Sequence, residues 1–177
     1  VGGRMAVGWM GRILWILVVL GPGVFSPAQG DPILGVDRVV VYKARRKLYL
    51  CRGDSLLKGY DIALGKNPAG HKQREGDSRT PEGRYVLDWR NAKSKYYRSL
   101  HISYPNKQDE ERAQKKGVSP GGAIMIHGYP EGASRSMWSR YWFLGRDWTD
   151  GCVAVSNEAM DEIWKAVSDG TVIEIFP

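Results

Sequence analysis

The residue types that can do nucleophilic chemistry lie at two points of the chain. Cys152 follows Gly151, and a glycine before the thiol allows a tight turn and the close approach of a substrate backbone. His127 ends an apolar segment just before Gly128. Thiolate is the reactive form of cysteine, so an imidazole beside the sulfur would activate it for acyl transfer through a thioester.

Backbone and carboxylate groups near Cys152 are candidates for supporting roles. The two N–H groups that follow the thiol can point to the space beside the sulfur, as an oxyanion hole requires. Asp150 has two interpretations: it accepts a hydrogen bond from His127 and fixes the tautomer, or it is exposed to solvent, which we favour. A backbone carbonyl near Gly128 would orient His127 equally well.

Each candidate also has a non-catalytic interpretation. Cys152 taken alone fits an inert buried thiol, and His127 taken alone fits a structural histidine. A Cys51–Cys152 disulfide is a further alternative, and it would silence the thiol. His71 and His101 are expected to be structural. No metal site is expected, because the histidines and cysteines lack ligand spacing.

The hydrophobic pattern predicts the elements that position these groups. Alternating residues indicate a hairpin within 36–52. Further strands are expected at 56–64, 85–89, 100–104, 122–128, 153–155 and 171–176, with a long ordered loop over 65–83. Short helices are expected over 106–116 and from Ser156 or Asn157 to Gly170. The aromatic-rich segment 129–148 has no clean periodicity. The pattern predicts a β-dominated α+β domain over about 36–177.

Composition and charge narrow the classes of function. The chain has 177 residues, 42% of them hydrophobic and 25% charged, which fits one folded domain with a tail. The net charge of +7 would favour an anionic polymer, anionic lipid or nucleic acid. Nucleic-acid binding is not expected, because no basic helix, repeat or recognition motif is present.

The first thirty residues have the order of a secretory signal peptide. Arg4 and Arg12 precede the apolar run 13–20, and small residues at Ala28 and Gly30 would allow cleavage before Asp31. We expect a signal peptide over 1–30, a catalytic domain over 31–177, and an exported, monomeric protein of the periplasm or cell wall. An uncleaved membrane anchor is the alternative for the leader.

From about Asp37 onward, the chain resembles the L,D-transpeptidase (YkuD-type) family of bacterial cell-wall enzymes. Four ordered motifs carry the resemblance: Gly76–Tyr85, Ser103–Asn106, Gly121–Gly128 and Thr149–Val155. The resemblance implies a YkuD-like mixed β-sheet sandwich with a few short helices, and it implies no cofactor.

The same resemblance implies roles for residues. Cys152 is the nucleophile, His127 the general base, and Gly151 with neighbouring amides stabilises the oxyanion. The donor is a peptidoglycan stem peptide, attacked at the L-centre carbonyl of its diamino acid, and an amine then takes the acyl group.

Two departures open alternatives. Where the family commonly has His before Gly-Cys, this chain has Asp150, and where it commonly has Arg two residues after the Cys, this chain has Ala154. These features resemble a subgroup with hydrolytic members. The alternatives are therefore an L,D-carboxypeptidase, an amidase that releases a protein linked to the wall, and a non-catalytic wall-binding module.

Two further groups are candidates for substrate binding. Arg79 and Arg84, with Lys72 and Arg74, would hold stem-peptide carboxylates through charge-assisted hydrogen bonds, or they form a solvated basic loop. The aromatic insert includes the second group, Tyr129 and Trp148, and forms either a lid over the thiol or a satellite core.

Overall fold

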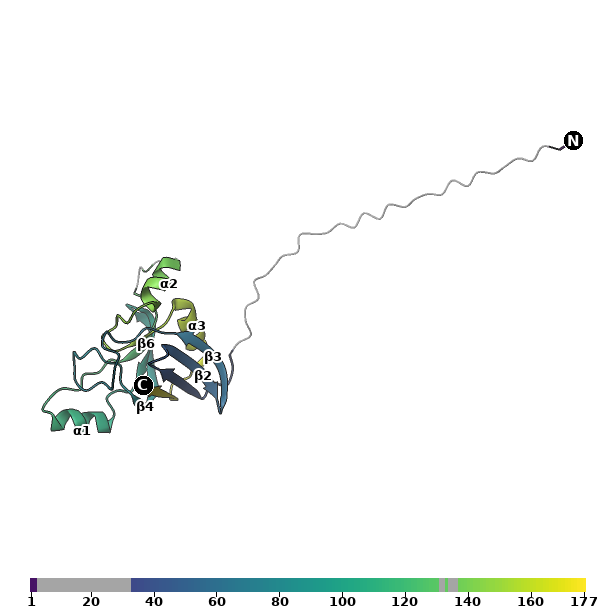
Figure 1. Cartoon of the computed structure of the whole chain (residues 1–177). Helices are drawn as coiled ribbons and strands as arrows, with labels where there is room; N and C mark the ends of the chain where they lie inside the picture. The colour runs from purple at the N-terminus through teal and green to yellow at the C-terminus, as the bar shows by residue number, and fades with distance from the viewer. Residues whose placement is uncertain (3–32, 131–132, 134–136) are drawn as a thin grey trace. The chain divides into compact units, whose positions relative to one another are not determined.

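The computed structural model describes residues 1–2, 33–130, 133 and 137–177 (Figure 1). The chain divides into two units, Val1–Asp31 and Pro32–Pro177. The predicted signal peptide lies outside the described residues, apart from its first two. Among the described residues, no helix has the length and apolar character needed to cross a membrane.

The described part of Pro32–Pro177 contains one eight-stranded sheet in the order β3-β2-β1-β8-β4-β5-β6-β7. Its strands are β1 (Arg38–Tyr42), β2 (Lys47–Arg52), β3 (Ser55–Asp61), β4 (Gly83–Ser94), β5 (Tyr97–Ile102), β6 (Met125–His127), β7 (Val153–Ala154) and β8 (Thr171–Phe176). The β1–β8 and β6–β7 pairs are parallel, and the other pairs are antiparallel. The predicted β-dominated α+β fold with a mixed sheet is confirmed.

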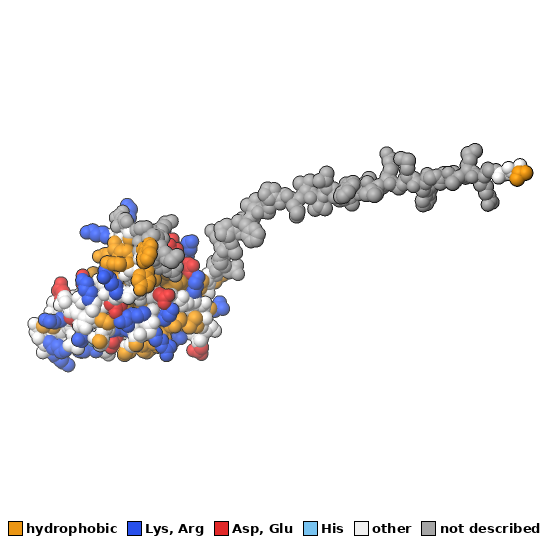
Figure 2. Space-filling model, turned by 45° about the horizontal axis from the view of Figure 1, so that its top comes forward, with side chains coloured by type: hydrophobic (Ala, Val, Ile, Leu, Met, Phe, Trp, Pro, Cys, Tyr) orange, Lys and Arg blue, Asp and Glu red, His pale blue; other side chains and the backbone are white. Residues whose placement is uncertain are grey.

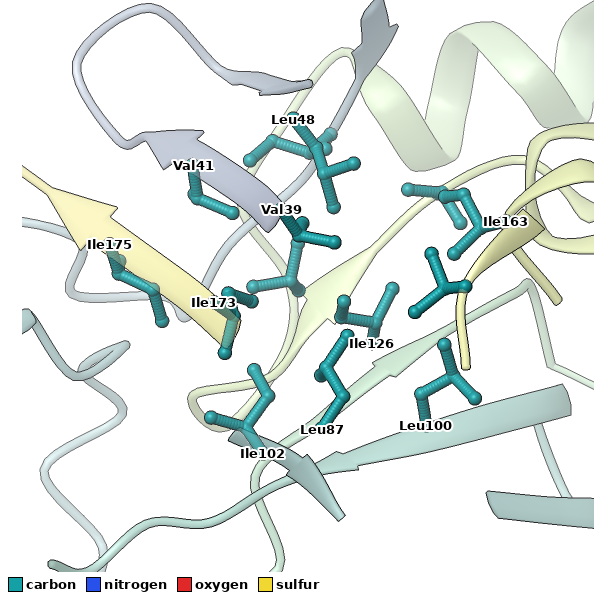
Figure 3. Close-up of a cluster of buried hydrophobic side chains, with 14 of the residues drawn as sticks. Val39, Val41, Leu48, Leu87, Leu100, Ile102, Ile126, Ile163, Ile173 and Ile175 are labelled. Atoms are coloured by element: carbon teal, nitrogen blue, oxygen red, sulfur yellow. The ribbon is translucent and has the colours of Figure 1, made fainter. Parts of the chain in front are cut away.

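The strand register explains why alternating residues fold this way. Val39 pairs with Leu50 on β2 and with Ile173 on β8, and all three side chains are fully buried. Their neighbours two residues along repeat the pattern, so one face of the hairpin and of β8 enters the core (Figure 3). The hairpin predicted within 36–52 is confirmed.

Two of the three helices in the described residues match the predicted ones. Helix α1 (Lys107–Lys115) begins at Asn106, whose side chain accepts a hydrogen bond from the Asp109 N–H in a capping box. Helix α3 (Asn157–Ala166) begins at Ser156, and it buries Met160 and Ile163 in the core.

Helix α2 (Met137–Leu144) was not predicted. Trp138, Tyr141 and Trp142 are 82%, 76% and 50% exposed. These residues recur at i, i+3 and i+4, so they share one helix face, and the space-filling view shows hydrophobic side chains gathered at this helix (Figure 2). The four consecutive apolar residues 141–144 obscure this spacing, which is why the pattern did not indicate a helix.

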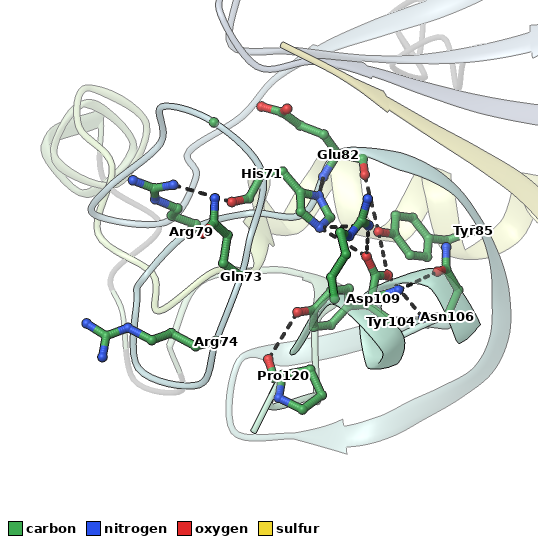
Figure 4. Close-up of polar contacts among 12 residues, drawn as sticks. His71, Gln73, Arg74, Arg79, Glu82, Tyr85, Tyr104, Asn106, Asp109 and Pro120 are labelled. Carbon is green, nitrogen blue, oxygen red and sulfur yellow. Dashed lines mark hydrogen bonds and ion pairs between the residues drawn. The ribbon is translucent and has the colours of Figure 1, made fainter. Parts of the chain in front are cut away.

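The loop between β3 and β4 is ordered by buried polar groups rather than by strands. The Asp77 carboxylate accepts hydrogen bonds from the backbone N–H groups of Gln73, Arg74 and Arg79 and from the Lys72 ammonium. Burial alone would raise the pKa of Asp77, but these donors lower it to about 2. Earlier in the same loop, His71 lies 3.0 Å from the Asp109 carboxylate of α1 (Figure 4). The predicted ordered loop is confirmed.

Candidate active site

The parallel pairing of β6 and β7 places the segments that carry the two predicted catalytic residues side by side. Ile126 pairs with Val153, and His127 pairs with Ala154. Ile126 and Val153 are both fully buried in the core. Because side chains alternate along a strand, His127 and Cys152 point to the opposite face. Cys152 directly precedes β7, so it lies two residues before Ala154, the strand partner of His127.

His127 is held as a neutral base. Its Nδ1 lies 2.7 Å from the Gly128 carbonyl oxygen. A carbonyl only accepts hydrogen bonds, so Nδ1 carries the proton and Nε2 has a lone pair. Burial lowers the pKa of His127 to about 4, although the Gly128 carbonyl acts in the opposite direction. The imidazole is therefore uncharged at neutral pH, which is the form that accepts a proton.

Two aromatic rings pack against the imidazole. The Tyr96 ring lies 4.6 Å from that of His127, and the Trp148 ring meets His127 edge-on at 5.6 Å. Trp148 donates a hydrogen bond from Nε1 to the Phe143 carbonyl, and Phe143 stacks on Tyr129. Trp148 and Tyr129 thus belong to one aromatic group beside the site. Tyr96, which precedes β5 in a turn, had no signal in the sequence.

Cys152 is a free thiol at this site. Both Cys152 and Cys51 are unpaired, and Cys51 is buried on β2, so the alternative disulfide is not formed. The Cys152 Sγ donates to the Ala123 carbonyl oxygen at 3.6 Å. Burial raises the pKa of Cys152, and a hydrogen bond from the Met125 backbone lowers it in part. The resting pair is consequently a thiol and a neutral imidazole rather than an ion pair.

Gly151 and Thr149 shape the turn that presents the thiol. Gly151 has φ +130°, and a Cβ there would lie 2.7 Å from the Arg79 carbonyl oxygen. The predicted tight turn is present, but this carbonyl, and not a substrate backbone, makes the close approach. Thr149 is buried, and its hydroxyl donates to the Cys152 carbonyl and accepts from the Gly151 N–H. Sequence reasoning gave Thr149 no role.

The backbone amides near the sulfur are largely engaged within the protein. The Ala154 N–H donates to the Ala63 carbonyl at 2.8 Å, so the expected use of this amide in an oxyanion hole is wrong. The Gly151 N–H is held by Thr149. The Cys152 N–H has no hydrogen-bond acceptor among the described residues. It is therefore the candidate oxyanion donor.

Two other predicted site residues lie apart from this group. Asp150 is 82% exposed and forms an ion pair with Lys66 at 2.8 Å, so Gly128, not Asp150, orients His127. Arg84 approaches Glu174 at 3.4 Å and lines a pocket that includes neither Cys152 nor His127. In both cases the side chain pairs with a residue of opposite charge instead of joining the site, and the local sequence did not indicate that partner.

No three His, Cys, Asp or Glu side chains gather as a metal site would require, within the part of the chain that the structure describes. The chemistry available at this site from those residues is that of a nucleophilic sulfur, a neutral base and a backbone donor.

Comparison with known proteins identifies the family. The profile of the L,D-transpeptidase catalytic domain (YkuD) matches residues 36–175. The chain belongs to this family. The chain is also 29% identical over 150 residues to the putative L,D-transpeptidase YafK of Escherichia coli K12, an alignment that covers 81% of this chain and 50% of YafK. It therefore spans about half the length of this curated relative.

Several solved structures share the fold. The helical cell shape determining protein Pgp2 of Campylobacter jejuni, solved as a point mutant, has a TM-score of 0.58 at 25% identity, covering 82% of this chain and 51% of its own. Bd1075 of Bdellovibrio bacteriovorus has a TM-score of 0.54 at 25% identity, with coverage of 81% and 48%. An L,D-transpeptidase from Xylanimonas cellulosilytica has a TM-score of 0.52 at 17% identity, covering 83% of this chain and 63% of its own, and supports the fold alone.

Proposed function

We propose that this L,D-transpeptidase-family domain is a cysteine acyltransferase of the bacterial cell envelope that acts on peptidoglycan stem peptides. The observation that supports the proposal is the β6–β7 register, which pairs a neutral His127 with Ala154, two residues after Cys152. Membership of the family supports the substrate class. Export through residues 1–30 is part of the proposal, because peptidoglycan lies outside the cytoplasm.

The first half of the reaction forms a thioester. Nε2 of His127 takes the thiol proton as the Cys152 sulfur attacks the carbonyl carbon at the L-centre of the donor's diamino acid. The negative charge on the tetrahedral oxygen is stabilised by the Cys152 N–H. When the intermediate collapses, the bond to the terminal D-residue breaks, and the imidazolium gives its proton to the departing amine.

The second half transfers the acyl group. An amine from another stem peptide attacks the thioester, His127 takes a proton from that amine, and the sulfur leaves and recovers a proton from His127. The product is a cross-link. Water in place of the amine gives a shortened stem peptide, which is the carboxypeptidase outcome. An amide bond to a wall-linked protein in the donor site would be cut by the same steps.

Incubation with purified tetrapeptide muropeptides tests the proposal. Cross-linked dimer, detected by mass spectrometry, supports transfer, while tripeptide without dimer supports hydrolysis at the same site. Cys152→Ala is expected to abolish both products. Cys51→Ala is the matched control and keeps them, because Cys51 is a buried thiol on β2. A folded wild-type protein that binds muropeptides without forming either product would instead be a wall-binding module.

A further inference from the structure

A second hollow of the domain lies between the loop 67–79 and the C-terminal end of α1. It has a volume of about 380 Å³, and its lining includes Arg74, Arg79 and Lys116. Figure 4 shows the guanidinium groups of Arg74 and Arg79 extending to the same side of the loop, away from the His71–Asp109 contact. The hollow therefore presents three cationic side chains together.

None of the three cations in this pocket forms an ion pair with another described residue. Arg74 is exposed, and its side chain has no hydrogen bond or ion pair with any described residue. Within the described part of the chain, the Arg79 guanidinium donates only to the His71 carbonyl, at 3.5 Å. The Lys116 ammonium donates to the neutral side chain of Gln73 at 2.7 Å. These three groups keep donors available for an incoming anion.

The acid in the pocket lining is already engaged. Asp77 accepts from three backbone N–H groups and from the Lys72 ammonium at 2.9 Å. The same hydrogen bonds hold the loop in place, so the arginines project from a rigid base. A pocket with free cationic donors and a saturated acid favours a carboxylate or another small anion as ligand.

Two sides of this pocket are connected to the neighbourhood of Cys152, one by a packing contact and the other by the chain itself. On one side, the Arg79 carbonyl packs against the Cα of Gly151, the residue before Cys152. On the other, the segment after Lys116 runs to Ala123, whose carbonyl accepts from the Cys152 thiol. The Lys72 ammonium beneath the loop is also near enough to lower the pKa of Cys152 in part.

We propose that the Arg74–Arg79–Lys116 pocket binds a carboxylate of the peptide whose carbonyl Cys152 attacks, and so sets the register of the donor. This inference rests on the proposed function. Charge-assisted hydrogen bonds to a carboxylate are directional, and Arg offers a planar pair of donors. A donor peptide without that carboxylate loses the contact and binds less tightly.

Binding to the inactive Cys152→Ala protein, measured by calorimetry with a synthetic stem tetrapeptide, tests this pocket without requiring turnover. Arg74→Gln and Arg79→Gln are each expected to weaken binding about tenfold, the usual loss for a hydrogen bond to a charged group. The matched control is Arg52→Gln, because Arg52 is an exposed arginine on β2, near the other edge of the sheet. It is expected to bind like the parent.

Chemical variants of the peptide identify the anion. The stem peptide is amidated at one carboxylate at a time. One of these amidated peptides is expected to bind the Cys152→Ala parent about tenfold more weakly than the unmodified peptide does. The Arg74→Gln substitution is expected to weaken the binding of that peptide no further. Equal affinity of all amidated peptides, or Arg74→Gln and Arg79→Gln variants that bind like Arg52→Gln, overturns the inference. Inorganic phosphate that binds the pocket without competing with the peptide also overturns it.

The outcome is separable from that of the proposed function. Wild-type protein that forms neither dimer nor tripeptide contradicts the enzyme, whatever the pocket binds. Wild-type protein that turns over while the arginine variants bind normally contradicts the pocket alone.

Discussion

The His127 imidazole and the Cys152 thiol rest in their neutral forms. This resting state determines when the proton would move in the proposed mechanism. Burial lowers the pKa of His127 to about 4 and raises that of Cys152. A stored thiolate–imidazolium pair would need the opposite shifts. In the proposed mechanism, proton transfer therefore accompanies attack on the substrate, with Nε2 as a general base.

The pH dependence of the reaction follows from the lowered pKa of His127. Protonated imidazole cannot accept the thiol proton, so kcat/KM falls as the pH drops through about 4. An unperturbed histidine would place this acid limb near pH 6.5. Measurement of kcat/KM from pH 3.5 to 8 checks the expectation, and an acid limb near 6.5 would contradict it.

Replacement of a ring that buries His127 tests the cause of the shift. Trp148→Ala admits water to the imidazole, so the acid limb is expected to move upward toward pH 6.5. Trp138→Ala removes the same type of side chain from the exposed face of α2 and is expected to leave the limb in place. An unmoved limb in Trp148→Ala would exclude this ring as a source of the desolvation.

At the scale of elements, the turn 149–152 depends on a contact between distant segments. Gly151→Ala would place a methyl group 2.7 Å from the Arg79 carbonyl oxygen while requiring φ +130°. Strained backbone conformations cost about 1–3 kcal/mol, and the clash adds to this. We expect Gly151→Ala to lower the thermal midpoint and to reduce turnover more than a glycine substitution in a turn far from Cys152 does.

The matched control for this turn is Gly53→Ala. Gly53 has φ +53°, and a Cβ there meets no atom within 4 Å. This variant is expected to lose some stability but to keep its turnover, because the β2–β3 turn lies away from β7 in the sheet order. Equal losses of turnover in the two variants would show that the Arg79 contact does not position the thiol.

The same elements show what could be predicted from the sequence. Alternation predicted the hairpin of β1 and β2, and an apolar run before His127 predicted β6, because local patterns record which face is buried. The partners of Gly151 and Asp150 could not be predicted, since each contact joins segments far apart in the chain. The orientation of His127 by Gly128 was among the alternatives because that contact is local.

At the scale of the whole molecule, the described strands and helices all belong to Pro32–Pro177, and the family match lies within that unit. A protein expressed from Asp31 onward is therefore expected to have the thermal midpoint and Cys152 reactivity of the full chain. If residues 1–30 are a cleaved signal peptide, intact-mass measurement of the exported protein finds Asp31 as its first residue. A mass that retains the apolar run 13–20 in a membrane fraction would favour the uncleaved anchor, and retention of that run in soluble cytoplasmic protein would contradict export.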